Sequence, residues 1–249
     1  MKDFIPETDS NSKEKFKGIY ILPNLFTISA LFAGFYAIVA ATKGAFEIAA
    51  IALFVAMLLD NLDGRVARLT NTQSAFGAEL DSMSDMVAFG LAPALILYHW
   101  SLMGLGKVGW LISFFYTATA ALRLARFNSQ INVVDKSYFK GLPAPVAAAV
   151  VSGFVWNCVD FEVSGNTPVV AITCAFATIF VALLMISNIR YYSFKTIDFK
   201  GRVHYLWALL VILLLIIIVL EPAKFLFLGC LLYTLSGLLS TFTKKRHLK

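Results

Sequence analysis

The chain has 249 residues, of which 59% are hydrophobic and only 14% are charged, with a formal net charge of +6 at pH 7. A soluble domain carries about 45–50% apolar and about 25% charged residues. This much apolar surface cannot be buried inside a water-soluble globule of this size, so the composition excludes an ordinary soluble domain and indicates an integral membrane protein.

Eight apolar segments are candidate spanning helices, because about 20 residues cross the hydrocarbon core of a bilayer. They cover about 20–42, 44–62, 76–100, 107–127, 143–159, 167–188, 203–220 and 222–242. We therefore predict an all-α, polytopic membrane protein with about eight transmembrane helices. The fifth segment is short, with Pro143 and Pro145 at its start, and only Glu221 and Pro222 separate the last two.

The placement of Lys and Arg predicts the orientation of these segments. With a cytoplasmic N-terminus, all but three of the 21 basic residues fall in cytoplasmic segments, the exceptions being Lys43, Lys107 and Lys224. This asymmetry indicates an even number of spans with both termini in the cytoplasm. The positive charge is therefore interpreted as a membrane-topology signal, and no nucleic-acid partner is expected.

Four aspartates lie where the second span ends and the third begins. Asp60 and Asp63 are three residues apart, and Asp81 and Asp85 are four apart, so each pair shares one helix face. The connection "LTNTQSA" is short and polar, which predicts that the two helices are antiparallel neighbours. All four carboxylates are then expected at the cytoplasmic side.

Four carboxylates in this setting require a compensating positive charge. Each one costs about 2.5–3.5 kcal/mol in a spanning helix, and two divalent cations, Mg²⁺ or Mn²⁺, would offset that cost with oxygen ligands of the preferred kind. Paired metal ions are a common device of phosphoryl transfer. Small residues beside the carboxylates leave room for a phosphorylated ligand, and Arg68 is suited to a phosphate oxygen; alternatively, Gly64, Ala67 and Gly77 are ordinary helix-packing residues.

The full spacing resembles the signature of a known family, the CDP-alcohol phosphotransferases. It runs Asp60-x2-Asp63-Gly64-x2-Ala67-Arg68-x8-Gly77-x3-Asp81-x3-Asp85, and all eight positions match. Four further segments resemble the bacterial phosphatidylserine synthase branch of that family: "LPNLFTISALFAGF", "AALRLARFN", "YFKGLPAPVAAA" and "ISNIRYYSFK". The resemblance implies the CDP-alcohol phosphotransferase fold with a core of six transmembrane helices over 20–195. It leaves a cytoplasmic segment at 1–19 and two additional helices with a basic tail at 196–249.

The resemblance also implies a reaction, in which CDP-diacylglycerol and L-serine give phosphatidylserine and CMP in the cytoplasmic (inner) membrane of a bacterium. It implies that Asp60, Asp63, Asp81 and Asp85 hold the two metals and that Asp85 is also the general base. Gly64, Ala67, Arg68 and Gly77 would line the cytidine diphosphate site. A homodimer is expected on the same grounds.

Other polar residues are weaker candidates for the site. Asn24 and Thr27, at the entry of the first span, either cap that helix or touch the nucleotide. Arg123, Arg126 and Lys140 either anchor the cytoplasmic interface or bind the serine carboxylate or a substrate phosphate.

Two alternative functions remain at this point. A sibling enzyme would use another acceptor, such as glycerol 3-phosphate, inositol or choline. A divalent-cation transporter would instead distribute its carboxylates across the depth of the bilayer, whereas the four aspartates here cluster on one side.

Overall fold

The computed structural model describes residues 21–130, 138–192 and 205–246. The segment predicted as cytoplasmic at 1–19, the start of the extension at 196–204 and the last three tail residues lie outside these ranges. The described residues form the elements α1 (Ile21–Thr42), α2 (Phe46–Leu69), α3 (Ala75–Asp85), η2 (Met86–Leu91), α4 (Ala92–Trp100), η3 (Leu102–Leu105), α5 (Lys107–Gln130), β1 (Tyr138–Lys140), α6 (Ala144–Asp160), α7 (Pro168–Ile186), β2 (Arg190–Tyr192), α8 (Tyr205–Leu220) and α9 (Pro222–Arg246).

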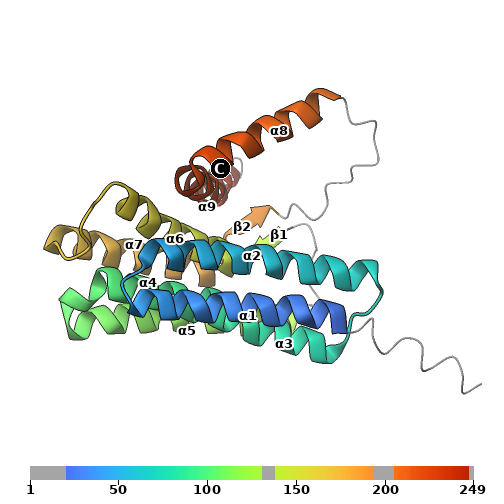
Figure 1. Cartoon of the computed structure of the whole chain (residues 1–249), viewed down its shortest axis with the longest axis horizontal. Helices are drawn as coiled ribbons and strands as arrows, with labels where there is room; N and C mark the ends of the chain where they lie inside the picture. Colours follow the sequence, from blue (N-terminus) through green and yellow to red (C-terminus); the bar gives the residue numbers. More distant parts are fainter. Residues whose placement is uncertain (1–20, 131–137, 193–204, 247–249) are drawn as a thin grey trace, which may run out of the picture.

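All eight predicted apolar segments are helical, which confirms the helical class (Figure 1). Within the described residues, five stretches are long and apolar enough to cross a membrane: Ile21–Thr42, Ala75–Trp100, Lys107–Ser129, Pro168–Ile186 and Pro222–Ser240. The chain is thus a membrane protein by the length and apolarity of its helices. Charged residues keep α2 out of that group, and α6 and α8 are shorter, with 17 and 16 residues. The number of eight spans stays a prediction.

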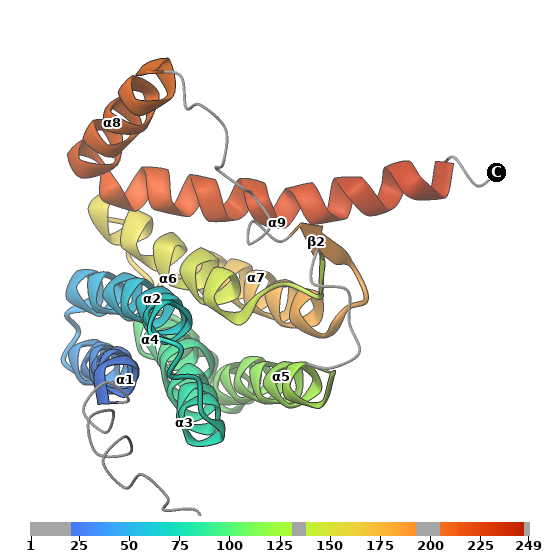
Figure 2. The same ribbon diagram turned by 90° about the vertical axis from the view of Figure 1, so that its right-hand side faces the viewer.

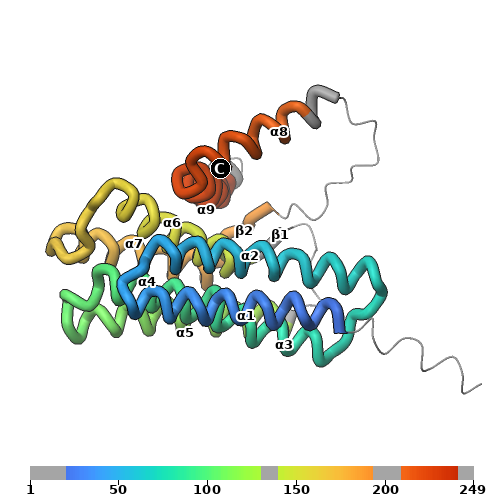
Figure 3. Tube along the Cα trace, viewed as in Figure 1, coloured from blue at the N-terminus to red at the C-terminus, as the bar shows by residue number. Residues whose placement is uncertain are grey.

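The helices from α1 to α7 run back and forth along the bundle, so that successive turns lie at its opposite ends, whereas α9 runs across it (Figure 2). Figure 3 shows the α1–α2 turn at one end and the α2–α3 turn at the other. Small residues fill the contact between α1 and α2, which lets the two backbones approach closely. Buried alanines of the two helices include Ala33, Ala37, Ala40 and Ala41 on α1 and Ala49, Ala52 and Ala56 on α2, all in one core cluster.

The predicted third span is one continuous helical stretch that changes its winding directly after Asp85. Residues 86–91 form a π-helical segment, η2, which is a feature often found at functional sites. Pro93 has no N–H to offer the carbonyl of Phe89, and the Tyr116 hydroxyl of α5 donates to that carbonyl instead, at 3.3 Å. Thr117 similarly donates to the Gly90 carbonyl at 3.2 Å. Side chains of α5 therefore satisfy the backbone that the irregular winding leaves free.

The expected packing of the two aspartate helices needs a correction. The stretch 75–100 does contact α2, but through η2 and α4, whereas α3 packs mainly on α1 (Figure 2). Ser84 of α3 donates to the backbone carbonyl of Thr27 on α1, at 3.1 Å. Because α3 leans toward α1, space opens between α3 and the end of α2.

Two short strands that the sequence analysis did not predict lie near the same end of the bundle. β1 and β2 pair antiparallel, with Lys140 opposite Arg190. Gly141 follows in the left-handed region (φ +80°), where a Cβ would collide with the Met185 carbonyl, so glycine is needed there. Leu142 then donates to the Leu184 carbonyl at 3.0 Å, and α6 begins after Pro143, as predicted.

The last two helices form the outer layer of the molecule. α9 packs on α6 and β2, and α8 packs mainly on α9 (Figure 2). α8 exposes apolar side chains from Leu209 to Ile216. Only Glu221 separates α8 from α9, so the turn between them is tight.

Candidate active site

Three of the four aspartates converge at the end of α2 and the middle of α3. Asp60 and Asp63 come from the last turns of α2 and Asp81 comes from α3, and one carboxylate oxygen of each lies within 4.8 Å of the other two. Asp63 is buried and the other two are half-buried. Oxygen atoms of three carboxylates at this separation form a donor set that suits a hard divalent cation.

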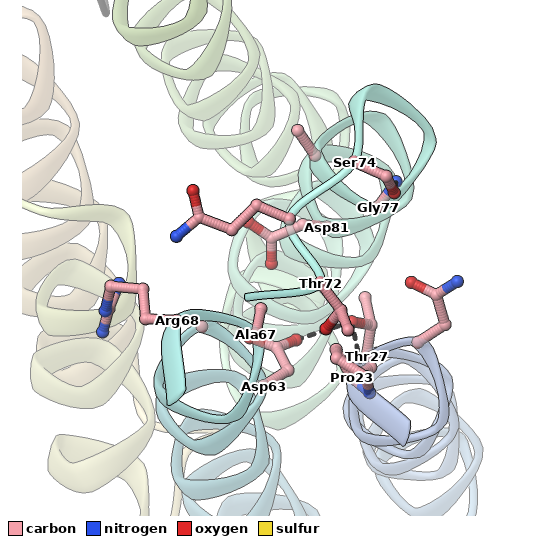
Figure 4. Close-up of a pocket in the computed structure, with 13 residues that line it drawn as sticks. Pro23, Thr27, Asp63, Ala67, Arg68, Thr72, Ser74, Gly77 and Asp81 are labelled. Carbon is pink, nitrogen blue, oxygen red and sulfur yellow. Dashed lines mark hydrogen bonds between the residues drawn. The ribbon is translucent and has the colours of Figure 1, made fainter. Parts of the chain in front are cut away.

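A cavity of ≈ 290 Å³ opens beside these carboxylates, between α1, α2 and α3. Figure 4 shows Asp63, Asp81, Thr27 and Thr72 near its centre. All six residues predicted to bind the nucleotide line it, together with two of the aspartates. The lining is Pro23, Asn24, Thr27, Asp63, Gly64, Ala67, Arg68, Thr72, Gln73, Ser74, Gly77, Ala78 and Asp81.

The two glycines of the signature serve the cavity in different ways. A Cβ on Gly77 would lie 3.2 Å from Ser74 Oγ and 3.3 Å from Asn24 Oδ1, so glycine allows α1 and the start of α3 to close together. A Cβ on Gly64 would meet only the Arg68 guanidinium, at 3.6 Å from Nη1. Packing does not require glycine at position 64, and its absence of a side chain leaves the cavity wall open to a ligand.

The α2–α3 turn contributes residues that the sequence analysis missed. Ser74 caps α3, because its hydroxyl accepts a hydrogen bond from the Gly77 N–H at 3.0 Å. Thr72 is buried and its hydroxyl contacts that of Thr70 at 2.7 Å. Asn71 adopts a positive φ of 52°, which turns the chain back toward the site. A serine directly before a helix was the signal for the cap; nothing in the sequence marked Thr72 or Gln73.

Asn24 and Thr27 lie inside α1 and face the cavity, so neither caps that helix. The Thr27 hydroxyl lies 2.7 Å from Asp63 Oδ2 and 3.2 Å from the Pro23 carbonyl oxygen. Thr27 therefore reaches the carboxylate cluster directly.

Asp85 lies one helical turn beyond Asp81 and does not line the cavity. It is a neighbour of Asp60, and Arg123 of α5 is close enough to attract it. Among the described residues, no hydrogen-bond partner reaches the buried Asp85 Oδ1 or the buried Arg123 Nε. A buried carboxylate oxygen without a partner is costly, and it fits a site that acquires a cation or a substrate hydroxyl.

The other two basic candidates are placed differently. Arg126 donates to Asn188 Oδ1 at 2.6 Å and to the Ile186 carbonyl at 3.4 Å, which ties α5 to the end of α7. Lys140 is exposed on β1. Neither these two residues nor Arg123 lines the cavity, and of the three only Arg123 is brought next to an aspartate of the signature.

Known proteins resemble this chain over most of its length. The family model described as CDP-alcohol phosphatidyltransferase matches residues 20–238. A CDP-diacylglycerol–serine O-phosphatidyltransferase of Helicobacter pylori is 37% identical over 223 residues, which cover 89% of this chain and 91% of that protein. An archaetidylserine synthase of Methanothermobacter thermautotrophicus is 33% identical over 180 residues, 72% of each chain. A Mycobacterium tuberculosis protein with the same name as the first is 39% identical over 142 residues, 55% of this chain and 49% of that protein.

Proposed function

Because the chain belongs to the CDP-alcohol phosphatidyltransferase family, we propose that it transfers the phosphatidyl group of CDP-diacylglycerol to the hydroxyl of L-serine. The products are phosphatidylserine and CMP. The observation that carries the proposal is the convergence of three signature aspartates beside a cavity lined by Gly64, Ala67, Arg68 and Gly77 of the same signature. Serine as the acceptor is supported by the names of relatives that align over most of both chains.

The carboxylate cluster would hold two divalent cations, Mg²⁺ or Mn²⁺, through Asp60, Asp63, Asp81 and Asp85. The three close carboxylates and the unpartnered oxygen of Asp85 fit such ions. When bound, the ions supply positive charge that stabilises the diphosphate and the departing phosphate. The cavity beside them would take the cytidine diphosphate group, with Asn24, Gly64, Ala67, Arg68 and Gly77 along its wall.

Asp85 is proposed to act as the general base, because a serine hydroxyl is a poor nucleophile at neutral pH. The proton of the serine hydroxyl passes to the Asp85 carboxylate as the serine oxygen bonds to the phosphorus that carries diacylglycerol. The bond from that phosphorus to the bridging oxygen breaks, and CMP leaves with that oxygen. The buried, unpartnered Oδ1 of Asp85 supports this role.

Arg123 is proposed to bind the serine carboxylate. It attracts Asp85, yet its Nε and Asp85 Oδ1 both lack a hydrogen-bond partner within the described residues, so these two atoms do not pair with each other. An acceptor with a hydroxyl at one end and a carboxylate at the other would complete both. Glycerol 3-phosphate, inositol and choline have no carboxylate.

The membrane setting follows the same proposal. The site would lie at the cytoplasmic face of the inner membrane, so that the acyl chains stay in lipid while serine and cytidine arrive from water. We also expect both termini in the cytoplasm and a homodimer, on the charge asymmetry of the sequence and the family resemblance respectively.

The test is to incubate the purified protein with CDP-diacylglycerol, Mg²⁺ or Mn²⁺, and one of four labelled acceptors: serine, glycerol 3-phosphate, inositol or choline. We expect CMP release with serine. Release with glycerol 3-phosphate and none with serine would instead identify the sibling enzyme. Cation flux into liposomes without any CMP release would identify the transporter.

A further inference from the structure

Thr27 has a hydroxyl that contacts a signature aspartate across two helices. We propose that Thr27 is a positioning residue, which holds one oxygen of Asp63 so that the other oxygen is presented to a metal ion. This inference rests on the proposed function, because it assumes that Asp63 is a metal ligand. In this proposal Thr27 acts by orienting the Asp63 carboxylate and not by contacting the nucleotide.

The contact is short, buried and joins distant parts of the chain. Thr27 Oγ1 donates to Asp63 Oδ2 at 2.7 Å, and the two residues are 3% and 5% exposed. The same residue accepts a hydrogen bond at its backbone carbonyl from Ser84 of α3, at 3.1 Å. A single residue of α1 is therefore bonded to the ligand-bearing end of α2 and to the helix that carries Asp81.

The hydroxyl has one proton and two possible acceptors. The Pro23 carbonyl oxygen is 3.2 Å away and neutral, whereas Asp63 Oδ2 is 2.7 Å away and belongs to an acid. Hydrogen bonds to an ionised acceptor are shorter and about twice as strong as neutral ones. When Asp63 is ionised, the Thr27 hydroxyl therefore donates its proton to Asp63 Oδ2 and not to the Pro23 carbonyl. This hydrogen bond fixes the rotation of the Asp63 carboxylate.

A fixed carboxylate binds a metal ion more tightly than a freely rotating one. Groups that hydrogen-bond to a metal ligand orient it, and removing one typically costs about 10–100-fold in metal affinity. The bond to Thr27 engages a lone pair of Oδ2, so we assign the ion to Oδ1. Asp60 and Asp81 complete the group within 4.8 Å.

The experiment compares Mn²⁺ binding to full-length, substrate-free protein in detergent, by electron paramagnetic resonance or calorimetry. Thr27→Val keeps the branched shape and removes the hydroxyl, and we expect about 10–100-fold weaker Mn²⁺ binding. Thr27→Ser keeps the hydroxyl and should restore the Mn²⁺ affinity of the original protein. Ser29→Ala is the matched control, because Ser29 lies on the same helix, does not line the cavity and donates to the Leu25 carbonyl of that helix.

Unchanged Mn²⁺ affinity in Thr27→Val overturns the inference. If that variant also binds CDP more weakly at saturating Mn²⁺, Thr27 contacts the nucleotide instead. If Thr27→Val does not fold, Thr27→Ala decides the question by the same measurement. An original protein that binds no Mn²⁺ would remove the metal assignment and the inference with it. That result is distinguishable from failure of the acceptor assignment, which is read from CMP release.

Discussion

At the scale of single residues, Asp85 and Arg123 differ most from their neighbours, since each keeps a buried polar atom without a partner in the described part of the chain. A folded chain normally satisfies such atoms. Their position next to the carboxylate cluster is therefore best explained by a substrate that supplies the missing partners.

Replacing Asp85 with Asn removes the base and keeps the size of the side chain. We expect kcat for CMP release to fall at least about 100-fold, because a positioned general base contributes about 10²–10⁴-fold. CDP binding should persist in part, since Asp60, Asp63 and Asp81 remain. The control is Asp160→Asn, at the exposed far end of α6. Normal turnover in Asp85→Asn would rule out the base.

Replacing Arg123 with Gln tests the recognition of serine. Loss of a hydrogen bond to a charged group costs about 1.5–3 kcal/mol, so KM for serine should rise about tenfold or more. KM for CDP-diacylglycerol should stay within about twofold, because Arg123 does not line the cavity proposed for the cytidine diphosphate group. A twofold change is small beside the tenfold change that corresponds to about 1.4 kcal/mol. Arg65→Gln is the control, because Arg65 is exposed on α2 and does not line the cavity. Parallel changes in both KM values would argue for a structural role of Arg123.

Arg126 illustrates how contacts alter an expectation. Its place three residues after Arg123 predicts a second serine-binding arginine, whose loss would raise KM for serine selectively. Its bonds to Asn188 and Ile186 predict instead that Arg126→Ala lowers thermal stability and affects both KM values alike. A selective rise in KM for serine, measured in the same assay, would restore the first interpretation.

At the scale of elements, α9 packs against β2 through tyrosine side chains. The Tyr191 ring is fully buried and lies against Gly237, where a Cβ would collide with it. The Tyr191 hydroxyl donates to the Thr234 carbonyl at 3.4 Å, and the Tyr233 hydroxyl donates to the Tyr192 carbonyl at 2.9 Å. Since β2 pairs with β1, the C-terminal helix supports the short sheet that precedes α6.

Two glycines of α9 allow a matched test of this contact. Gly237→Leu should destabilise the protein by about 1–3 kcal/mol through overpacking, and should increase hydrogen exchange in 189–192. Gly229→Leu, eight residues earlier on the same helix, should have little effect, because nothing lies within 4 Å of a Cβ there. Equal thermal unfolding temperatures for the two variants would refute the fastening of α9 on β2.

At the scale of the whole molecule, charge is separated between the two ends of the bundle. The carboxylate cluster shares its end with Arg65, Arg68, Arg123 and Arg126, whereas Lys43, Lys107 and Lys224 stand at the opposite turns (Figure 1). The basic excess is the cytoplasmic signal, so the carboxylate end should face the cytoplasm.

Single cysteines test this orientation in a background with Cys158, Cys174 and Cys230 replaced by Ala. Gly104→Cys, at the end opposite the site and with open space around its Cβ, should react with an impermeant maleimide in intact spheroplasts. Gln73→Cys, exposed in the α2–α3 turn, should react only after permeabilisation. The reverse pattern would invert the topology.

The sequence by itself determined the properties that depend on local periodicity. The length of the apolar segments predicted a helix at each of the eight places. The three-residue spacing of Asp60 and Asp63 predicted that both lie on one face of α2. The gapped signature also selected Gly64, Ala67, Arg68 and Gly77, which line the cavity, because a fixed spacing on two helices joined by a short turn limits where side chains can lie. These features depend on one helix or one turn.

Only the tertiary structure decided which distant groups meet. It placed Thr27 on Asp63, leaned α3 on α1 so that a cavity opens, and separated the roles of Arg123 and Arg126 despite their similar positions on α5. It also revealed the π-helical turn after Asp85 and the contact of α9 with β2. Each of these depends on how helices far apart in the chain pack and on which buried polar groups pair, and neither is encoded in the period of a single segment.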